Sequence, residues 1–416
     1  MIKSFGGKDL NLTRRKIVCL ILLIINTMEK ENSSGAGQSK TVQTLQPYPR
    51  IAAEIPGKNL TEERISAPIT NYDLCFAWNW ELDADFAMFL DQACRTQGLS
   101  LLKITPENIV ELSKTFLKRQ MAFQVFLDRA SDTDLRFMPI VQWAREYASY
   151  RINPYEKAIR TWDKTTMHLI LIDAGLYAPY TIILPPYKEQ STLPPIDLSP
   201  LGKCFIIKPS HGGGGDGVLM EVTLWSQVLA ARQEHPADKY LLQFHIVPTQ
   251  LGTRAAWFRV LYCAGKVYPC WWDIQTHVYT PVTADEEAHY ALHPLHDITR
   301  SIARLCELDL FSTEISLTPE GRFVVVDYVN DQVDLRLQSK TPDGVPDEIV
   351  QNIAKGLAEL VATYRLPSQN GTISVRSAPV EERTFVLRQA QNEQGKTSPH
   401  LAGASPTETS QGQHRG

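Results

Sequence analysis

The chain has 416 residues, of which 43% are hydrophobic and 21% are charged. This apolar content excludes a wholly disordered chain, and at about 150 residues per domain the length suggests two or three domains. Its 42 basic and 46 acidic residues leave a net charge of −4, so the chain lacks the basic excess of a dedicated nucleic-acid binder.

The cysteines and the N-terminal residues give indications of the cellular compartment of the protein. The seven cysteines are scattered and include no Cys-x-x-Cys pair, which favours a reducing compartment and therefore the cytoplasm. Three basic residues, 14–16, precede a short apolar run at residues 17–26, as in a signal peptide. The run is shorter than the roughly 20 residues of a membrane span. It is either a targeting segment or an upstream extension, and membrane association is expected only through it.

The chain is predicted to begin with a flexible segment, residues 1–68, followed by a small α/β domain over residues 69–160. Apolar runs and helical periodicity alternate through this domain. The expected elements are a strand at Tyr72–Trp78, a helix at Asp83–Thr96, a strand at Leu99–Ile104, a helix that begins after Thr105-Pro106, and a strand at Met121–Leu127. This order indicates a parallel sheet. Residues Asn153–Trp162 are interpreted as a link to the next domain.

The second domain is predicted over residues 161–366, and a disordered tail over residues 367–416. Its first half is expected to contain a helix at Lys164–Ala174, an extended segment at Ala178–Leu184, a Pro-rich loop at 185–200, strands at Lys203–Lys208 and Val218–Val222, and a helix at Leu224–Arg232. Its second half is expected to contain strands at Tyr240–Ile246, Ala256–Cys263, Lys266–Trp272, Phe311–Leu317 and Arg322–Val329, with helices at Leu295–Leu308 and Asp347–Tyr364.

The strongest local signal is the glycine-rich turn at His211–Gly217. An apolar strand ends at Lys208, and four consecutive glycines, Gly212, Gly213, Gly214 and Gly215, follow shortly after it. Glycine lets backbone N–H groups approach a phosphate together, and the lysine adds a full positive charge. Because the turn lies between two strands, the sequence predicts a hairpin lid over a nucleotide. A mobile surface turn is the alternative.

Acidic and amide side chains gather on the last two predicted strands. Glu314 lies on one strand, and Asp327, Asn330 and Asp331 lie on or just after the next. Carboxylate oxygens and phosphates together hold hard cations such as Mg²⁺. Solvated strand ends are the alternative interpretation of these carboxylates.

Taken in order, these features resemble the ATP-grasp superfamily over about residues 72–364. The matching order is a lysine-bearing helix followed by Gly175 and Pro179-Tyr180-Thr181, the strand with Lys208 and its glycine loop, a hinge strand, an Arg259 strand with a glycine hairpin, and an acidic strand pair. The resemblance implies an α/β chain (an α+β ATP-grasp fold) in which a small parallel-sheet domain precedes a two-sheet ATP-grasp domain that binds ATP and Mg²⁺, or Mn²⁺ in its place.

The resemblance also implies a role for each site residue. Lys164 and Lys208 would contact phosphates, and Gly212–Gly215 would close over them. Gln243, Phe244 and His245 occupy the position of the hinge that holds adenine. Arg259 would neutralise charge on the transferred phosphate. Glu314, Asp327 and Asn330 would carry the magnesium ion.

The sequence departs from the family pattern in two places. The usual last strand has Glu-x-Asn, which puts both ligands on one face, whereas Asp327 and Asn330 are three positions apart. Strict alternation would leave Asn330 on the opposite face. A β-bulge would restore it, and otherwise Asp331 would be the third ligand. The hinge also has Phe244 where an acidic residue is common.

The function implied by this resemblance is a ligase that activates a carboxylate as an acyl phosphate for attack by an amine or a similar nucleophile. Lys208 and Arg259 would be its catalytic residues, and a small molecule its substrate. Two alternatives stay open: a kinase that phosphorylates a small-molecule hydroxyl, and a nucleotide-binding module without turnover. The sequence carries no signal for the substrate or the oligomeric state, although Trp78 and Trp80, and one of the adjacent Trp271 and Trp272, are candidates for lining a substrate pocket.

Overall fold

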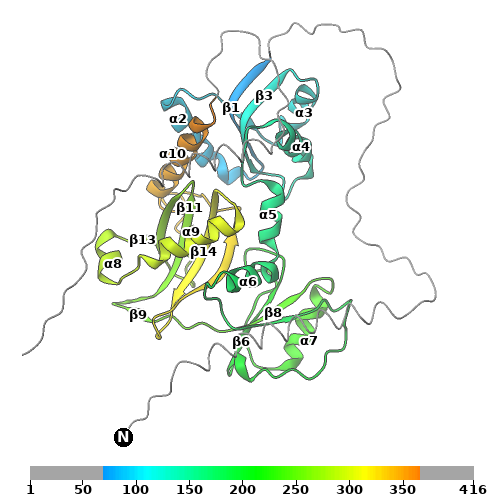
Figure 1. Cartoon of the computed structure of the whole chain (residues 1–416), viewed down its shortest axis with the longest axis vertical. Helices are drawn as coiled ribbons and strands as arrows, with labels where there is room; N and C mark the ends of the chain where they lie inside the picture. The colour runs from blue at the N-terminus through cyan, green and yellow to red at the C-terminus, as the bar shows by residue number, and fades with distance from the viewer. Residues whose placement is uncertain (1–68, 366–416) are drawn as a thin grey trace, which may run out of the picture. The chain divides into compact units, whose positions relative to one another are not determined.

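The computed structural model describes residues 69–365 (Figure 1). The predicted flexible segment 1–68, with its apolar run, and the whole of the predicted tail, 367–416, lie outside these residues. Within the described range, no helix is long and apolar enough to cross a membrane.

The first part of the described chain forms a four-stranded parallel sheet, which we call the N-terminal sheet. Its strand order is β2-β1-β3-β4. Its elements are β1 (Thr70–Trp78), a short 3₁₀ helix η1 (Glu81–Asp83), α2 (Ala84–Thr96), β2 (Leu101–Ile104), α3 (Ile109–Leu117), β3 (Met121–Arg129), η2 (Leu135–Phe137), α4 (Met138–Tyr147) and β4 (Tyr150–Ile152). The central strand β1 is buried continuously from Leu74 to Ala77 because helices cover both faces of a parallel sheet. The parallel sheet predicted from the sequence is confirmed, but α4 and β4 were not predicted.

Two helices lead from this sheet into the next part of the chain. Residues Asn153–Trp162 were interpreted as a link, and most of them form helix α5 (Tyr155–Trp162). Helix α6 (Lys164–Asp173) follows at once. Its first turn is capped by the carboxylate of Asp163, which accepts from the backbone N–H groups of Thr165 and Thr166.

A four-stranded antiparallel sheet follows, which we call the small sheet. Its strand order is β5-β8-β6-β7. Its elements are β5 (Thr181–Leu184), η3 (Ser199–Leu201), β6 (Phe205–Pro209), β7 (Leu219–Val222), α7 (Trp225–Glu234) and β8 (Tyr240–Phe244). Val228 and Ala231 of α7 pack on Phe205, Ile207 and Leu242 in one buried cluster. Strands β6 and β7 form the predicted hairpin with the glycines at its turn.

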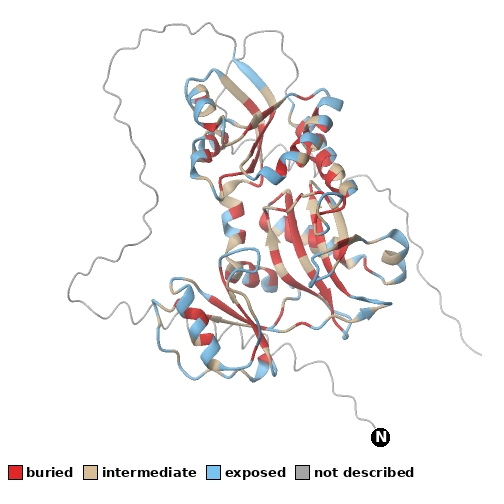
Figure 2. Ribbon diagram, turned by 180° about the vertical axis from the view of Figure 1, so that it is seen from behind, coloured by how far each residue is buried: buried red, intermediate tan, exposed pale blue. Residues whose placement is uncertain are grey.

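A five-stranded antiparallel sheet, the large sheet, completes the fold in the order β13-β12-β11-β14-β15. The remaining elements are β9 (Gln250–Leu251), β10 (Arg254–Ala255), β11 (Trp257–Cys263), β12 (Lys266–Trp272), β13 (Tyr279–Pro281), α8 (Ala284–His289), α9 (Pro294–Cys306), β14 (Leu310–Leu317), β15 (Phe323–Asn330) and α10 (Asp347–Thr363). One face packs on α9 through Phe258, Val260, Ile302 and other apolar residues. Figure 2 shows the buried stretches that run along these strands.

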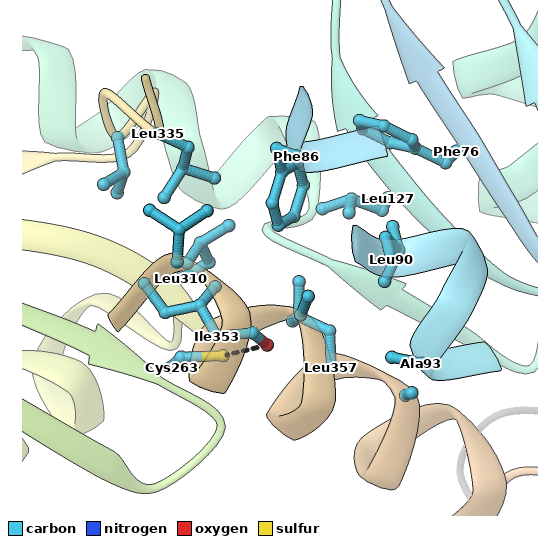
Figure 3. Packing of buried hydrophobic residues seen from close by; sticks show 14 of the residues in the cluster. Phe76, Phe86, Leu90, Ala93, Leu127, Cys263, Leu310, Leu335, Ile353 and Leu357 are labelled. Carbon is cyan, nitrogen blue, oxygen red and sulfur yellow. Dashed lines mark hydrogen bonds between the residues drawn. The ribbon is translucent and has the colours of Figure 1, made fainter. Parts of the chain in front are cut away.

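The last helix, α10, joins the largest apolar cluster of the described chain. Ile353 and Leu357 of α10 lie in one cluster with Phe86 and Leu90 of α2 and with Leu310 of β14 (Figure 3). The Cys263 thiol, on the large sheet, contacts the Ile353 carbonyl at 3.6 Å. Burying side chains of this size contributes about 1.5–3 kcal/mol each. This cluster therefore fixes the large sheet against α10 and α2.

Candidate functional site

The beginning of α6 is tied to the end of β6, and this contact places Lys164 beside the glycine loop. The Lys164 N–H donates to the Ser210 carbonyl at 2.8 Å, and the Thr165 N–H donates to Ser210 Oγ at 3.1 Å. The Ser210 hydroxyl in turn donates to Asp163. With its helix held in this way, Lys164 Nζ donates to the carbonyl of Gly212.

The glycine loop has a backbone that side chains would strain. Gly212, Gly214 and Gly215 have φ values of 111°, 62° and 82°, in the left-handed region that favours glycine. A Cβ added at Gly213, Gly214 or Gly215 would meet no atom within 4 Å. These residues are exposed. The loop therefore presents bare backbone next to Lys164, as a phosphate-binding flap requires.

Three cationic side chains converge on Asp327. Burial alone would raise the pKa of Asp327, but Lys208, Lys164 and Arg259 outweigh it and lower that pKa. Lys208 Nζ also lies 3.3 Å from the carbonyl of Val326, the residue before Asp327. Burial lowers the pKa of Lys164, and the positive charge of Lys208 adds to this effect while Asp327 opposes it. The charges of the two lysines, from α6 and from the small sheet, therefore act on the carboxylate of the large sheet.

Arg259 and Glu314 are cross-strand partners on β11 and β14. Arg259 Nη1 donates to Glu314 Oε1 at 2.8 Å, and the guanidinium lies 5.1 Å from the centre of the Trp272 ring. The other carboxylate oxygen of Glu314 accepts from Trp257 Nε1 at 3.1 Å. Burial raises the pKa of Glu314, and Asp327 adds to this although Arg259 opposes it. The pair thus anchors a guanidinium on the same face of the large sheet as Asp327.

The position of Asn330 is set by an irregularity in β15. Glu314 pairs with Asp327, and two residues earlier Ser312 pairs with Asn330, so β15 uses one more residue than β14 between these pairs. This bulge brings Asn330 to the face of Asp327, and its Nδ2 donates to Asp327 Oδ2 at 2.9 Å. Asp331 is directed elsewhere, because its Oδ1 accepts from Trp162 Nε1 at 2.9 Å. Of the two arrangements left open by the sequence, the structure has the bulge.

Glu314, Asp327 and Asn330 lie close enough together that they could serve as oxygen ligands for a metal ion. Two half-buried carboxylates with an adjacent amide could form an all-oxygen set of the kind that Mg²⁺ takes together with phosphates and water. Within residues 69–365, no group of three or more His, Cys, Asp or Glu side chains is placed to hold a metal ion. With two acidic members, the set could be completed by the phosphates of a nucleotide.

The predicted hinge residues Gln243, Phe244 and His245 lie at the end of β8 and differ from one another in exposure. Gln243 is 1% exposed, and its Nε2 donates to Tyr328 Oη at 2.7 Å and to Thr181 Oγ1 at 3.1 Å. The structure therefore uses the Gln243 side chain to join the small sheet to β15. Phe244 is 41% exposed, and His245 is half-buried. An adenine at this strand would meet the aromatic ring of Phe244 and backbone groups.

Several residues that hold the site were missed by sequence reasoning. Asp163 and Ser210 carry the contact between α6 and β6, and Trp257 holds Glu314. The N-cap pattern Asp-Lys-Thr-Thr could have indicated Asp163. The other contacts join residues far apart in the chain and leave no local signal.

Trp80 lies at a pocket away from the lysines and carboxylates described above, at the carboxyl end of the N-terminal sheet. A pocket of about 330 Å³ there is lined by Trp80, Asp83, Arg129 and Asp132 among others. Trp80 is 40% exposed, whereas Trp78 stacks on Phe76 with ring centres 4.7 Å apart. Of these two tryptophans, Trp80 is the one that faces a pocket.

The chain thus combines a parallel sheet, a small antiparallel sheet with a glycine hairpin, and a large antiparallel sheet. The α/β fold class predicted from the sequence, a small parallel-sheet domain followed by a two-sheet domain, is therefore confirmed.

The chain is similar to a number of solved structures. D-cycloserine synthetase DcsG is 15% identical with a TM-score of 0.49, over 69% of this chain and 99% of that one. D-alanine–D-alanine ligase from Bacillus anthracis, complexed with ATP, is 11% identical with a TM-score of 0.49, over 71% and 97%. A RimK domain ATP-grasp protein from Sphaerobacter thermophilus is 19% identical with a TM-score of 0.47, over 69% and 98%.

No model of a known protein family matches the chain, and no curated protein matches it in sequence. We therefore argue its function from the residues of the site.

Proposed function

We propose that the protein is an ATP- and Mg²⁺-dependent ligase that activates a carboxylate as an acyl phosphate. The observation that carries this proposal is the electrostatic influence of Lys164, Lys208 and Arg259 on the half-buried carboxylate of Asp327. Arg259 is also paired with Glu314, so three cations stand against two carboxylates. The phosphates of a nucleotide would balance the positive charge that is left.

The chemistry is a phosphoryl transfer followed by an acyl transfer. A carboxylate oxygen of the substrate attacks the γ-phosphorus of ATP, the bond from this phosphorus to the β,γ-bridging oxygen breaks, and ADP leaves with that oxygen. An amine nitrogen then attacks the acyl carbon of the acyl phosphate. The carbon–oxygen bond to the phosphoryl group breaks, inorganic phosphate leaves, and the nitrogen loses a proton.

The side chains of this chain act mainly by electrostatics and position. Lys208 and Lys164 bind the phosphate oxygens, and the backbone N–H groups of the glycine loop add further hydrogen-bond donors. The closed loop would also exclude water from the phosphates. Arg259 faces the transferred phosphoryl group and stabilises the charge that grows on its oxygens. A magnesium ion held by Glu314, Asp327 and Asn330 would neutralise phosphate charge. No side-chain nucleophile is required.

Lys208→Ala tests this assignment, with Lys203→Ala as the matched control. Lys203 is an exposed lysine just before the same strand, whereas Lys208 faces Asp327. Losing one charged donor to a transition-state oxygen costs about 100-fold or more in kcat. Lys208→Ala should therefore lose most ATP-dependent turnover while its circular dichroism spectrum stays native. Wild-type turnover in this variant would remove Lys208 from the mechanism.

The products separate ligation from the two alternatives. The full-length protein is incubated with MgATP and a panel of carboxylates and amines, and ADP, phosphate and organic products are measured. ADP with an equal amount of phosphate and an amide product supports the ligase. ADP with a phosphorylated alcohol would indicate a kinase, and nucleotide binding without ADP would indicate a binding module.

A further inference from the structure

A cavity of about 560 Å³ lies at the edge of the large sheet, lined by residues of β10, β11, β12 and the segment that follows β12. Trp257, Trp271 and Trp272 are among its walls, with Arg254, Gln275 and Thr280 as polar members of the lining. This volume is within the range of small-molecule binding sites, about 300–1,000 Å³. A hollow lined by three tryptophans is an unusual feature at the edge of a sheet.

Two of these tryptophans also contact the reacting end of the candidate site. Trp257 Nε1 donates to Glu314 Oε2 at 3.1 Å, and the Trp272 ring lies 5.1 Å from the Arg259 guanidinium. The wall of the cavity and the support of the catalytic pair are thus the same side chains. Arg259 does not line the cavity itself, but its guanidinium lies on the ring of Trp272, which does.

The outer wall of the cavity is a preformed turn over residues 273–278. Asp273 Oδ1 accepts from the backbone N–H groups of Gln275 at 2.8 Å and Thr276 at 3.0 Å. The His277 N–H closes the turn on the Asp273 carbonyl at 2.7 Å. The His277 ring stacks on Trp272 with centres 5.4 Å apart and an angle of 6° between planes. The cavity therefore has fixed walls without a ligand.

The chemistry of the walls points to an aromatic occupant. Arg259 and His277 lie against the ring of Trp272, and Arg254 lies 5.4 Å from the centre of Trp271. Because these side chains cover the faces of the Trp271 and Trp272 rings, we expect the edges of the two rings to face the cavity. The edge of an indole carries partial positive charge and attracts the face of another aromatic ring. The Arg259 guanidinium, which is paired with Glu314 and lies on the ring of Trp272, is the cation of the candidate site that would attract the carboxylate of such a molecule.

We propose that this cavity binds the carboxylate substrate and that this substrate is an aromatic carboxylic acid. Its ring lies among Trp257, Trp271 and Trp272, and its carboxylate lies at Arg259. Gln275 and Thr280 provide hydrogen-bonding groups for ring substituents. This inference rests on the proposed function of Arg259, since it assigns the substrate class of the same reaction.

The test fills the cavity without touching the catalytic residues. Ala255 lies on β10, is exposed and lines the cavity, so Ala255→Trp should occupy the space of the ligand ring. Ala288→Trp is the matched control, because Ala288 is an exposed residue of α8 outside the lining. Binding is measured by calorimetry on the full-length protein with a non-hydrolysable MgATP analogue present. The probes are benzoate, 3-phenylpropanoate and indole-3-acetate, with hexanoate as the aliphatic comparison.

We expect at least one aromatic acid to bind about tenfold more tightly than hexanoate, a difference of about 1.4 kcal/mol. Ala255→Trp should weaken that binding about tenfold or more, and Ala288→Trp should leave it within twofold, by the same free-energy scale. The proposal is overturned if no aromatic acid binds better than hexanoate, or if Ala255→Trp binds it as well as the wild type.

Binding of the nucleotide analogue is measured in the same proteins. If all three proteins bind it but the aromatic acids show no preference, the substrate class is wrong and the ligase proposal stands. If the wild type does not bind the nucleotide, the proposed function fails, whatever the acids do.

Discussion

Glu314 and Asp327 are cross-strand partners on β14 and β15, with a shift of register on each side of the pair. Cross-strand partners share one face of a sheet, so the two carboxylates are neighbours. Burial raises the pKa of Glu314, whereas Lys208 and the other cations lower that of Asp327 despite its burial. Burial therefore opposes the charge of Glu314, and the neighbouring cations favour the charge of Asp327.

Glu314→Gln should weaken magnesium-dependent stabilisation. The change also breaks the ion pair with Arg259, so the melting temperature without ligand should fall, and the gain on adding ligand is compared within each protein. A nucleotide analogue with Mg²⁺ at 100 times its dissociation constant adds about 2.7 kcal/mol to the wild type. The variant should gain clearly less, because one of the carboxylates that would hold the ion is gone.

Thermal unfolding with and without the Mg²⁺ complex measures this difference. Glu320→Gln is the control, because Glu320 is an exposed residue in the turn after β14. An equal magnesium-dependent rise in Glu314→Gln and in the wild type would exclude Glu314 as a ligand.

The glycine loop gives a second prediction with an internal control. Gly215 has a φ of 82°, whereas Gly213 has no positive φ, and neither would place a Cβ against another atom. Alanine in the left-handed region costs about 1–2 kcal/mol. Gly215→Ala should therefore lower kcat/KM for ATP about fivefold to thirtyfold, and Gly213→Ala should change it little. Steady-state kinetics at several ATP concentrations measures kcat/KM for both variants. Equal losses in Gly215→Ala and Gly213→Ala would show that the backbone conformation of Gly215 is not the cause of the loss.

Much of the fold followed from local patterns in the sequence. The β6–β7 hairpin was predicted because apolar strands flank the four glycines. Helix α6 was predicted because Gly175, which has a φ of 80°, follows it closely and stops the helix. Helix α4 was missed although Ile140, Val141 and Ala144 lie on its buried face. Its ten residues begin with Met138-Pro139, where the proline was a usable signal for a helix start.

The arrangement of the site could be predicted only in part, because it depends on pairing between distant strands. A bulge next to Asp327 was one of two arrangements that the Asp327–Asn330 spacing allowed, and only the pairing of β15 with β14 decides between them. The link between Asp163 and Ser210 spans 47 residues of sequence. The inward direction of the Gln243 side chain depends on Tyr328, 85 residues away.

Two glycines outside the loop should respond to alanine with opposite signs. A Cβ at Gly344 would lie 2.7 Å from the backbone carbonyl of Leu337, so Gly344→Ala should destabilise the fold by about 1–3 kcal/mol. Gly356 lies inside α10, and a Cβ there would meet Cys263 Sγ at an ordinary 3.5 Å. Gly356→Ala should therefore stabilise the fold by about 0.5–1 kcal/mol through helix propensity. Urea denaturation measures both, and a loss of stability in Gly356→Ala would contradict this packing of α10.

The last prediction concerns His168, a buried residue of α6. Tyr328 Oη accepts from Gln243 Nε2 at 2.7 Å and lies 2.7 Å from His168 Nδ1. The Tyr328 hydroxyl can donate to His168 Nδ1 when that nitrogen is unprotonated. His168 is 3% exposed, and burial lowers its pKa from 6.5 to about 4.

This depressed pKa makes the fold sensitive to acid. Above pH 6.5 the histidine is neutral in both states, and the fold has its full stability with respect to this group. As the pH falls from 6.5 towards 4, the unfolded chain takes up a proton that the folded chain refuses. The folded state should lose up to about 3 kcal/mol from this group over that window.

His168→Gln keeps a hydrogen-bonding side chain but cannot titrate, so its stability should fall less over the same window. The free energy of unfolding in urea is measured at intervals of pH for the wild type, His168→Gln and the exposed control His289→Gln. The difference between wild type and His168→Gln should shrink as the pH is lowered, and His289→Gln should follow the wild type. Parallel pH profiles for wild type and His168→Gln would mean that His168 is not held neutral between α6 and β15.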